Sequence, residues 1–154
     1  MKMLVTKTPG DRYGLTFGAL SMRCAVGRAG MVRDKMEGDG GSPVGTWPLR
    51  RVFFRADKIA KPQTKLQVVE ISPADGWCDA PGDRNYNRLV KLPYPASAED
   101  MWRKDDIYDI VVELGYNDDP VVPGKGSAIF LHIARKDYSP TAGCIAVSLK
   151  NMRA

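Results

Sequence analysis

Closely spaced turn sequences constrain the fold of this chain more than any other feature. Each is rich in Gly, Pro, Asp or Asn, and they occur at Pro9-Gly10-Asp11, Gly38-Asp39-Gly40-Gly41, Pro81-Gly82-Asp83, Asn117-Asp118-Asp119-Pro120 and Pro123-Gly124. The segments between them are short, apolar or alternating, and rich in residues that favour strands. A chain divided in this way predicts a mainly β domain.

The intervening segments give the positions of the expected strands. We predict strands at Met3–Lys7, Tyr13–Phe17, Leu20–Val26, Trp47–Phe54, Gln67–Ile71, Tyr108–Leu114, Ala128–Ile133 and Cys144–Val147. A helix is expected at Ser97–Lys104, with Ser97 as its N-cap. A second short helix is expected after Ser148, with Leu149 and Met152 on one face. Because no repeat or linker interrupts the pattern, we expect one domain over residues 1–154.

Composition and charge narrow the possible partners. The 154 residues include 44% hydrophobic and 27% charged residues, with a net charge of +5. This is the composition of an ordinary globular domain. The positive excess favours partners rich in phosphate or carboxylate, and nucleic acid, anionic lipid and peptidoglycan all qualify. The basic residues are scattered and form no recognition helix with interleaved aromatic residues, so nucleic-acid binding is not predicted.

Membrane insertion is not predicted either. No apolar run approaches the roughly 18–20 residues that a membrane span needs. The segment Met1–Lys7 is not an apolar signal segment. Either the chain is cytoplasmic or an export signal lies outside this sequence, and the sequence alone leaves both open.

Three cysteines, Cys24, Cys78 and Cys144, lie far apart, and the chain has one histidine, His132. Their spacing gives no support for a zinc site, and we expect no metal and no organic cofactor. Cys24 and Cys78 are interpreted as buried thiols, although a disulfide between them stays possible in an oxidising compartment. One cysteine is left over as a candidate reactive thiol.

Chemistry is concentrated near the end of the chain. His132 ends an apolar strand segment, and Cys144 begins another one twelve positions later. The connecting loop lets two neighbouring strands place both side chains together. An imidazole there could remove the thiol proton and create a nucleophile. Gly143 permits a sharp turn, so the amides of Gly143 and Cys144, together with that of Ala142, could stabilise an oxyanion. The alternative is a buried apolar cysteine and a structural histidine.

The order of these residues resembles the YkuD-type L,D-transpeptidase family. That family has a His, a short loop and then Ser/Thr-His-Gly-Cys, which is similar to His132 followed by Thr141-Ala142-Gly143-Cys144. Lys35–Trp47 resembles the Ser/Thr-Pro-x-Gly stretch that precedes a core strand. Further similar segments are Trp77-Cys78-Asp79, Asn85-Tyr86-Asn87-Arg88 and Gly115-Tyr116-Asn117, so the resemblance extends from about Cys24 to Leu149.

The resemblance implies a fold and an activity. The fold is a twisted mixed β-sheet sandwich with one or two short helices and the cysteine at a cleft. Cys144 would form an acyl-enzyme with a peptidoglycan stem peptide, with His132 as its base. The acyl group would pass to the side-chain amine of a diaminopimelate residue and cross-link the cell wall. It further implies a periplasmic or cell-envelope location and covalent inhibition by carbapenem-type β-lactams.

Two departures from the family pattern affect the substrate side of the site. Ala142 stands where the family usually has a histidine, and Ala146 replaces the usual Asn or Arg two positions after the cysteine. The donor stem and the type of cross-link are therefore left open. We expect substrate contacts from five residues: Tyr138, Ser139, Thr141, Arg88 and Asn117.

Other candidate residues and functions stay open beside this reading. Glu37 and Asp39 are interpreted as parts of a solvated turn rather than as substrate contacts. Trp47, Trp77 and Trp102 are expected in the core. The alternative functions are a cysteine carboxypeptidase or endopeptidase of wall peptides, and a catalytically silent peptidoglycan-binding module.

Overall fold

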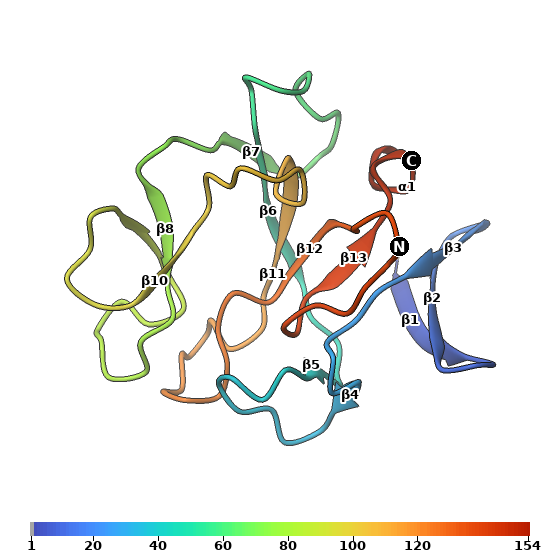
Figure 1. Cartoon of the computed structure of the whole chain (residues 1–154), viewed down its shortest axis with the longest axis horizontal. Coiled ribbons are helices and arrows are strands. Elements are labelled where there is room, and N and C mark those ends of the chain that lie inside the picture. The colour runs from blue at the N-terminus through green and yellow to red at the C-terminus, as the bar shows by residue number, and fades with distance from the viewer. Residues whose placement is uncertain (1) are drawn as a thin grey trace.

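The computed structural model describes residues 2–154 and is mainly β, with short strands joined by turns and loops and one short helix (Figure 1). Its centre is a mixed five-stranded sheet in the order β13-β12-β11-β6-β7. These strands are β6 (Leu49–Phe54), β7 (Gln67–Glu70), β11 (Ile110–Leu114), β12 (Phe130–Ile133) and β13 (Ile145–Val147). The two outer pairs, β12–β13 and β6–β7, are parallel, and the inner pairings are antiparallel.

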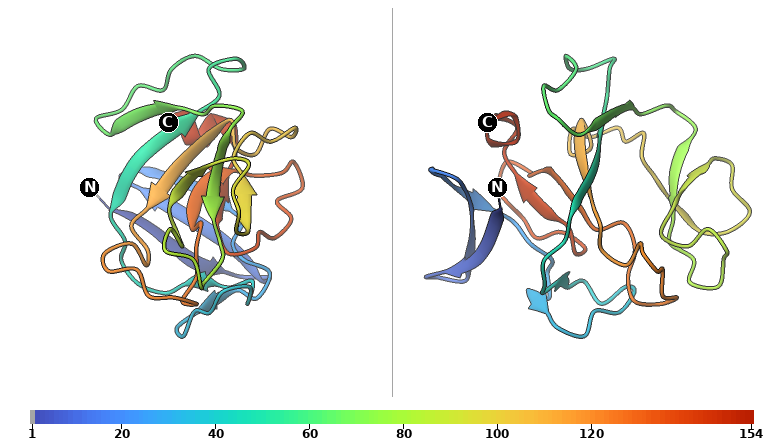
Figure 2. Two further views of the ribbon diagram at one scale, coloured as in Figure 1. Left: turned by 90° about the vertical axis from the view of Figure 1, so that its left-hand side faces the viewer. Right: turned by 180° about the vertical axis from the view of Figure 1, so that it is seen from behind.

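An antiparallel sheet formed by the N-terminal segment packs beside one edge of the central sheet (Figure 2). It contains β1 (Met3–Thr8), β2 (Arg12–Phe17) and β3 (Leu20–Cys24). Ala25, directly after β3, exchanges two backbone hydrogen bonds with Ala146 of β13, at 2.8 and 2.9 Å. This bridge fixes the N-terminal sheet against the strand that follows Cys144.

Two smaller sheets lie around the central one. The order β10-β8-β9 joins β8 (Asp75–Cys78), β9 (Leu89–Lys91) and β10 (Ala98–Asp100), and a parallel pair joins β4 (Met31–Val32) and β5 (Ser42–Pro43). The one described helix is α1 (Leu149–Arg153), with Ser148 as its N-cap. Within residues 2–154, no helical segment has the length and apolarity of a membrane span.

Two apolar clusters occupy the two faces of the central sheet, because successive side chains of a strand point to opposite sides. One cluster contains Val52, Ile110, Val112, Leu131, Ile133 and Val147, packed against Leu15 and Cys24 of the N-terminal sheet. We call this side the structural face. The other cluster contains Phe53, Val111, Phe130 and Cys144, packed against Trp77, Met101 and Tyr108. We call this side the pocket face.

The expectation of a mainly β fold is confirmed, and each of the eight predicted strand segments contains a strand. The short C-terminal helix is also confirmed, with Leu149 and Met152 packed on the structural face. The helix predicted at Ser97–Lys104 is wrong, because Ala98–Asp100 form strand β10 on the edge of β8. A helix this short is marginal by itself, whereas the edge of β8 offers backbone partners and a buried place for Met101.

The three cysteines are all free thiols and all buried. The disulfide left open between Cys24 and Cys78 is therefore not formed in the structure. Cys24 lies in the cluster of the structural face, while Cys144 lies in the cluster of the pocket face. The expected core position is confirmed for Trp77, which is 3% exposed, whereas Trp47 and Trp102 are only half-buried.

Candidate active site at Cys144

The backbone before Cys144 requires glycine at position 143. Gly143 has a φ of +145°, and a Cβ atom there would lie 2.9 Å from the carbonyl oxygen of Gly41. Both conditions exclude a side chain without a shift of the surrounding backbone. The glycine thus turns the chain tightly into β13 and sets Cys144 on the pocket face of the sheet.

Ser42 stabilises this turn through two hydrogen bonds of its side chain. Its side chain is fully buried, and its hydroxyl donates to the Gly143 carbonyl at 2.7 Å while accepting from the Gly27 amide at 2.9 Å. Ser42 belongs to the Gly-rich stretch that carries part of the family resemblance. Its place in the structure gives that stretch a physical role, because it joins three distant segments around the Cys144 turn.

The three backbone amides of this turn differ in their hydrogen bonds. The Gly143 amide donates to the hydroxyl oxygen of Thr141 at 3.1 Å, and that hydroxyl donates to the Cys144 carbonyl at 2.6 Å. Within residues 2–154, the amides of Ala142 and Cys144 have no acceptor. Two of the three amides considered for an oxyanion hole are therefore available, and the third is engaged by Thr141.

The thiol of Cys144 is almost covered, with 7% of the residue exposed. Its sulfur donates to the Ala128 carbonyl at 3.1 Å and accepts from the Phe130 amide at 3.3 Å. Burial raises the pKa of Cys144 to about 12, and the negative charge of Glu99 adds to this effect. Without a substrate, the group is a neutral thiol at pH 7.

His132 lies in the middle of β12 and is 5% exposed. Its Nδ1 is 3.0 Å from the carbonyl oxygen of Ile133. A carbonyl only accepts, so Nδ1 carries the hydrogen of the neutral ring and Nε2 keeps the lone pair. Burial lowers the pKa of His132 to about 4, so the ring is neutral at pH 7. Tyr108 packs its ring edge against it, with centroids 5.3 Å apart.

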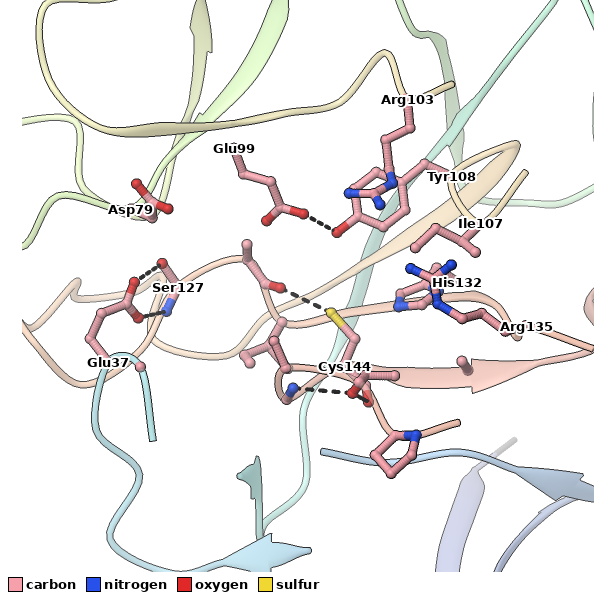
Figure 3. A pocket seen from close by; sticks show the side chains of 18 of the residues that line it. Glu37, Asp79, Glu99, Arg103, Ile107, Tyr108, Ser127, His132, Arg135 and Cys144 are labelled. Carbon is pink, nitrogen blue, oxygen red and sulfur yellow. Dashed lines mark hydrogen bonds between the residues drawn. The ribbon is translucent and has the colours of Figure 1, made fainter. Parts of the chain in front are cut away.

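His132 lies on β12, and Cys144 directly precedes the adjacent parallel strand β13, so the two residues are diagonal neighbours. His132 pairs with Ala146, and Cys144 precedes Ala146 by two positions, so both side chains point to the pocket face. With strands about 4.8 Å apart and a rise of about 3.3 Å per residue, such Cα atoms are roughly 8 Å apart. In the part of the chain that the structure describes, no hydrogen bond joins the two side chains. They border the same pocket side by side (Figure 3).

That pocket has a volume of about 380 Å³ and carries charged groups on both sides of Cys144. Carboxyl groups of Glu37, Asp79 and Glu99 lie on one side, and the guanidinium groups of Arg103 and Arg135 lie toward His132 (Figure 3). Its floor and rim come from backbone and small side chains at Ala128, Ile129, Ser139, Pro140, Thr141, Ala142, Gly143 and Ala146.

The structure brings some of the predicted substrate contacts to this pocket and not others. Ser139 and Thr141 line it. Tyr138 lies outside the lining, and the guanidinium of Arg23 stacks over its ring at 4.5 Å. Arg88 is exposed elsewhere, and the amide side chain of Asn117 bonds the backbone of Val122 and Gly126. These last three residues do not reach Cys144 here.

Sequence reasoning missed much of the pocket wall. It predicted no role for Glu99, Tyr108 or Arg103, because nothing in the local pattern marks them as pocket residues, and Asp79 was noted only as part of a segment similar to the family. Glu37 lies in a turn, as predicted, but its side chain is half-buried rather than solvated, since its carboxylate accepts from the Ser127 amide and hydroxyl at 3.0 and 2.6 Å within the pocket wall. When an Asp or Glu pairs with a residue that is distant in the sequence, the residues next to it in the chain do not indicate that pairing.

Comparison with known families agrees with this geometry. The chain matches the family YkuD: L,D-transpeptidase catalytic domain over residues 11–154, and it belongs to that family. No curated protein and no solved structure shows a significant match. The family connects this fold to transferase chemistry on peptidoglycan.

Proposed function

We propose that this chain is a peptidoglycan L,D-transpeptidase with Cys144 as its nucleophile and His132 as its base. The observation that supports this most strongly is that the one histidine, on β12, and one particular cysteine, directly before the adjacent strand β13, line the same pocket. The other two cysteines are not lining residues of that pocket. The membership of the chain in the YkuD family makes the wall peptide the natural substrate class.

Acylation begins with a proton transfer from the Cys144 sulfur to Nε2 of His132. The sulfur attacks a stem-peptide carbonyl, and the C–N bond to the C-terminal residue of the donor breaks. His132 returns the proton to the departing amine. The amides of Ala142 and Cys144 stabilise the oxyanion, and the Gly143 amide joins them when it exchanges Thr141 for the substrate oxygen.

The neutral state of both groups supports a substrate-triggered reaction. Because burial and the charge of Glu99 raise the pKa of Cys144 to about 12, the thiol loses its proton to His132 only as its sulfur attacks the bound substrate. An imidazole whose pKa is about 4 is a strong acid once protonated, so it readily protonates the leaving amine. The hydrogen bond from Nδ1 to Ile133 orients the ring for both steps.

Transfer of the acyl group to a diaminopimelate amine completes a cross-link, whereas transfer to water completes a hydrolysis. The charged pocket favours the amine over water as acceptor, because carboxyl groups line one side of Cys144.

A catalytically silent module is the second candidate, supported by the nearly covered sulfur and by Ala142 and Ala146. We propose the cell envelope as the place of action, where peptidoglycan lies.

Mass spectrometry of the chain with purified stem peptides tests the proposal. The expected result is an acyl adduct on Cys144 and the appearance of cross-linked dimers. A carbapenem is expected to give a covalent adduct on the same residue. Shortened monomers without dimers would indicate a hydrolase. The absence of adduct, dimer and shortened product, with the chain folded, would favour the silent module.

A further inference from the structure

The second half of the proposed reaction raises a proton problem that His132 does not solve. An aliphatic amine is mostly an ammonium ion at neutral pH, and an ammonium ion has no lone pair with which to attack a thioester. One proton must leave before attack and a second during amide formation. His132 has one free ring nitrogen, because Nδ1 is committed to Ile133.

Glu99 lies in the pocket on the side of Cys144 away from Arg135 (Figure 3). One carboxylate oxygen accepts a hydrogen bond from the Tyr108 hydroxyl, which fixes the direction of the side chain. The other oxygen has no hydrogen bond from residues 2–154. Its charge lies close enough to raise the pKa of the Cys144 thiol, so the carboxylate and the sulfur share one site.

A second carboxyl group marks the same side as a place for a cation. The Oδ1 atom of Asp79 is buried and is the one buried side-chain N or O atom among residues 2–154 without a hydrogen-bond partner. Asp79 lines the pocket, and its charge acts on Glu99. An unpartnered buried carboxylate oxygen is costly unless a donor reaches it. An entering ammonium group supplies such donors.

We propose that Glu99 binds the acceptor ammonium and removes its first proton, with Asp79 as a second contact. This inference rests on the proposed transpeptidase function and adds a catalytic residue to it. His132 then acts only on the second proton. Tyr108 is a positioning residue that holds Glu99 in place.

The atoms and charges of the step balance. The ammonium gives one proton to Glu99 and becomes a neutral amine. Its lone pair forms a C–N bond to the thioester carbonyl, and the second proton passes to His132 as the C–S bond breaks. His132 returns that proton to the Cys144 thiolate, and Glu99 releases its own to water. The products are the amide, the free thiol and one solvent proton.

The groups around Glu99 suit a base at neutral pH. Burial raises the pKa of Glu99, and the charges of Asp79 and Glu37 act in the same direction. The Tyr108 hydrogen bond and the guanidinium of Arg103 act in the opposite direction. Lys35, also at the pocket, is engaged by Asp39 at 2.5 Å. A raised pKa brings a carboxylate closer to the working pH and makes it a better proton acceptor.

Separate measurement of the two half-reactions tests this role. Acyl-enzyme formed from a tetrapeptide donor is mixed with either diaminopimelate or hydroxylamine, which is neutral at pH 7. For Glu99→Gln we expect transfer to diaminopimelate at pH 7 to slow by about 100-fold, the scale of a lost acid–base group. Transfer to hydroxylamine should slow by less than about threefold, because that acceptor has no proton to lose before attack.

A matched control and a pH profile complete the design. Glu70→Gln removes the same charge from an exposed site on β7, and both transfers should keep the wild-type rate. Raising the pH should restore transfer in Glu99→Gln as the free amine accumulates. Equal slowing with both acceptors, or a loss that persists at high pH, would overturn the assignment.

The failure of this inference is distinct from the failure of the proposed function. If the wild-type chain forms no acyl-enzyme, the transpeptidase proposal fails before Glu99 is tested. If Glu99→Gln does not fold, the wild-type chain supplies the measurement. The high-pH rate of the wild-type chain, multiplied by the fraction of diaminopimelate present as free amine at pH 7, gives the rate expected without a base for the first proton. The measured transfer rate at pH 7 should exceed this value. Equality of these two rates would overturn the role of Glu99.

Discussion

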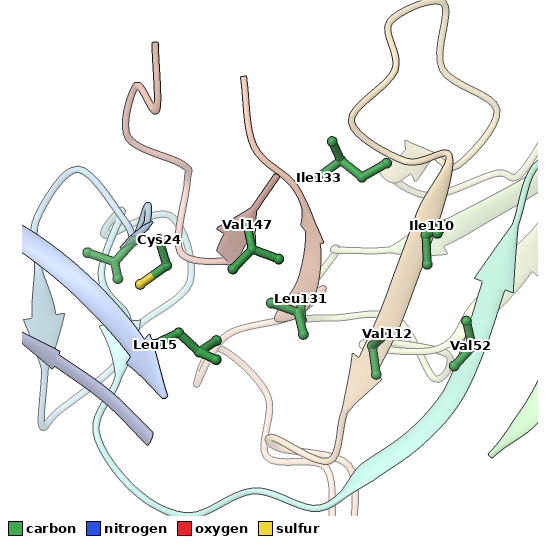
Figure 4. Packing of buried hydrophobic residues seen from close by; sticks show 9 residues of the cluster. Leu15, Cys24, Val52, Ile110, Val112, Leu131, Ile133 and Val147 are labelled. Atoms are coloured by element: carbon green, nitrogen blue, oxygen red, sulfur yellow. The ribbon is translucent and has the colours of Figure 1, made fainter. Parts of the chain in front are cut away.

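The structural face and the pocket face of the central sheet come from alternate residues of the same strands. On β12, Leu131 and Ile133 enter the apolar cluster shown in Figure 4, while Phe130 and His132 point to the pocket side. The structural face packs against the N-terminal sheet and α1 through apolar side chains, and a second pocket of about 750 Å³, lined mostly by apolar residues such as Leu15, Val52 and Leu131, lies between them. The pocket face mixes aromatic packing with buried polar groups. One rigid set of strands thus supports both stability and chemistry.

Burial alone does not distinguish the proposed nucleophile from the other cysteine on the opposite face. Burial raises the pKa of Cys24 to about 11 and that of Cys144 to about 12. Both are therefore neutral thiols at pH 7. They differ in their surroundings, because Cys144 has a pocket, two hydrogen bonds to its sulfur and an imidazole on the adjacent strand. Cys24 has apolar neighbours.

Replacement of the pocket-face cysteine should have the largest effect. Cys144→Ala is expected to lower cross-linking by at least about 1,000-fold, because no other group replaces the nucleophile. The rate of dimer formation from purified muropeptides measures it. Cys24→Ala is the matched control and should keep the wild-type rate per folded molecule. A comparable loss of cross-linking in both variants would show that catalysis is not confined to the pocket face.

His132→Asn removes the base while it keeps a polar side chain on β12. We expect acylation to slow by about 100- to 1,000-fold, the range for a lost general base. Its melting temperature should stay close to that of the wild type. Acyl-enzyme formation followed by mass spectrometry gives the rate. Retention of more than a tenth of the wild-type rate would remove His132 from the mechanism.

Leu131→Ala alters the neighbouring residue on the opposite face. Leu131 is 4% exposed in the apolar cluster, so its truncation should lower the free energy of unfolding by about 3 kcal/mol. Urea denaturation measures this loss. Activity per folded molecule, assayed at low temperature, should be unchanged. A specific loss of activity without destabilisation would contradict the separation of the two faces.

The pH dependence of thiol labelling should distinguish Cys144 from an exposed thiol. Because its pKa is raised to about 12, the thiolate fraction rises about tenfold per pH unit below that value. Iodoacetamide labelling of Cys144, followed by peptide mass spectrometry, should increase accordingly from pH 7 to 10. A plateau near pH 8.5 would indicate a thiol with an ordinary pKa.

The smallest effect is expected at the cap of α1. The Ser148 hydroxyl accepts from the Asn151 amide at 3.2 Å, and the helix packs Leu149 and Met152 on the structural face. Ser148→Ala should lower the stability by about 1 kcal/mol and leave activity unchanged. Thermal denaturation measures the change. A loss of activity would show that α1 also influences the pocket face.

Much of the architecture was predictable because its signals are local. The turn sequences and the alternating segments place all five strands of the central sheet within a few residues, β12 and β13 included. The short strands β4, β5, β8, β9 and β10 were not predicted. They contain two to four residues and exist because a partner strand lies beside them, which their own composition does not record.

The candidate site was likewise predictable only in part. Its order of His132, Gly143 and Cys144 is readable along the chain, and so is the family that this order resembles. Ser42 was seen only as part of a motif, and its bonds to Gly27 and Gly143 came from the structure.

The amino-acid sequence determined the strands, the turns and the two residues on which the proposed chemistry depends, because periodicity, glycine and cysteine act over short distances. Tertiary structure decided that the segment at Ala98–Asp100 pairs as a strand, that Cys144 is a covered neutral thiol, and that Glu99 and Asp79 face it. Hydrogen bonding, burial and charge depend on groups brought together from distant positions, and such encounters exist only after the chain has folded.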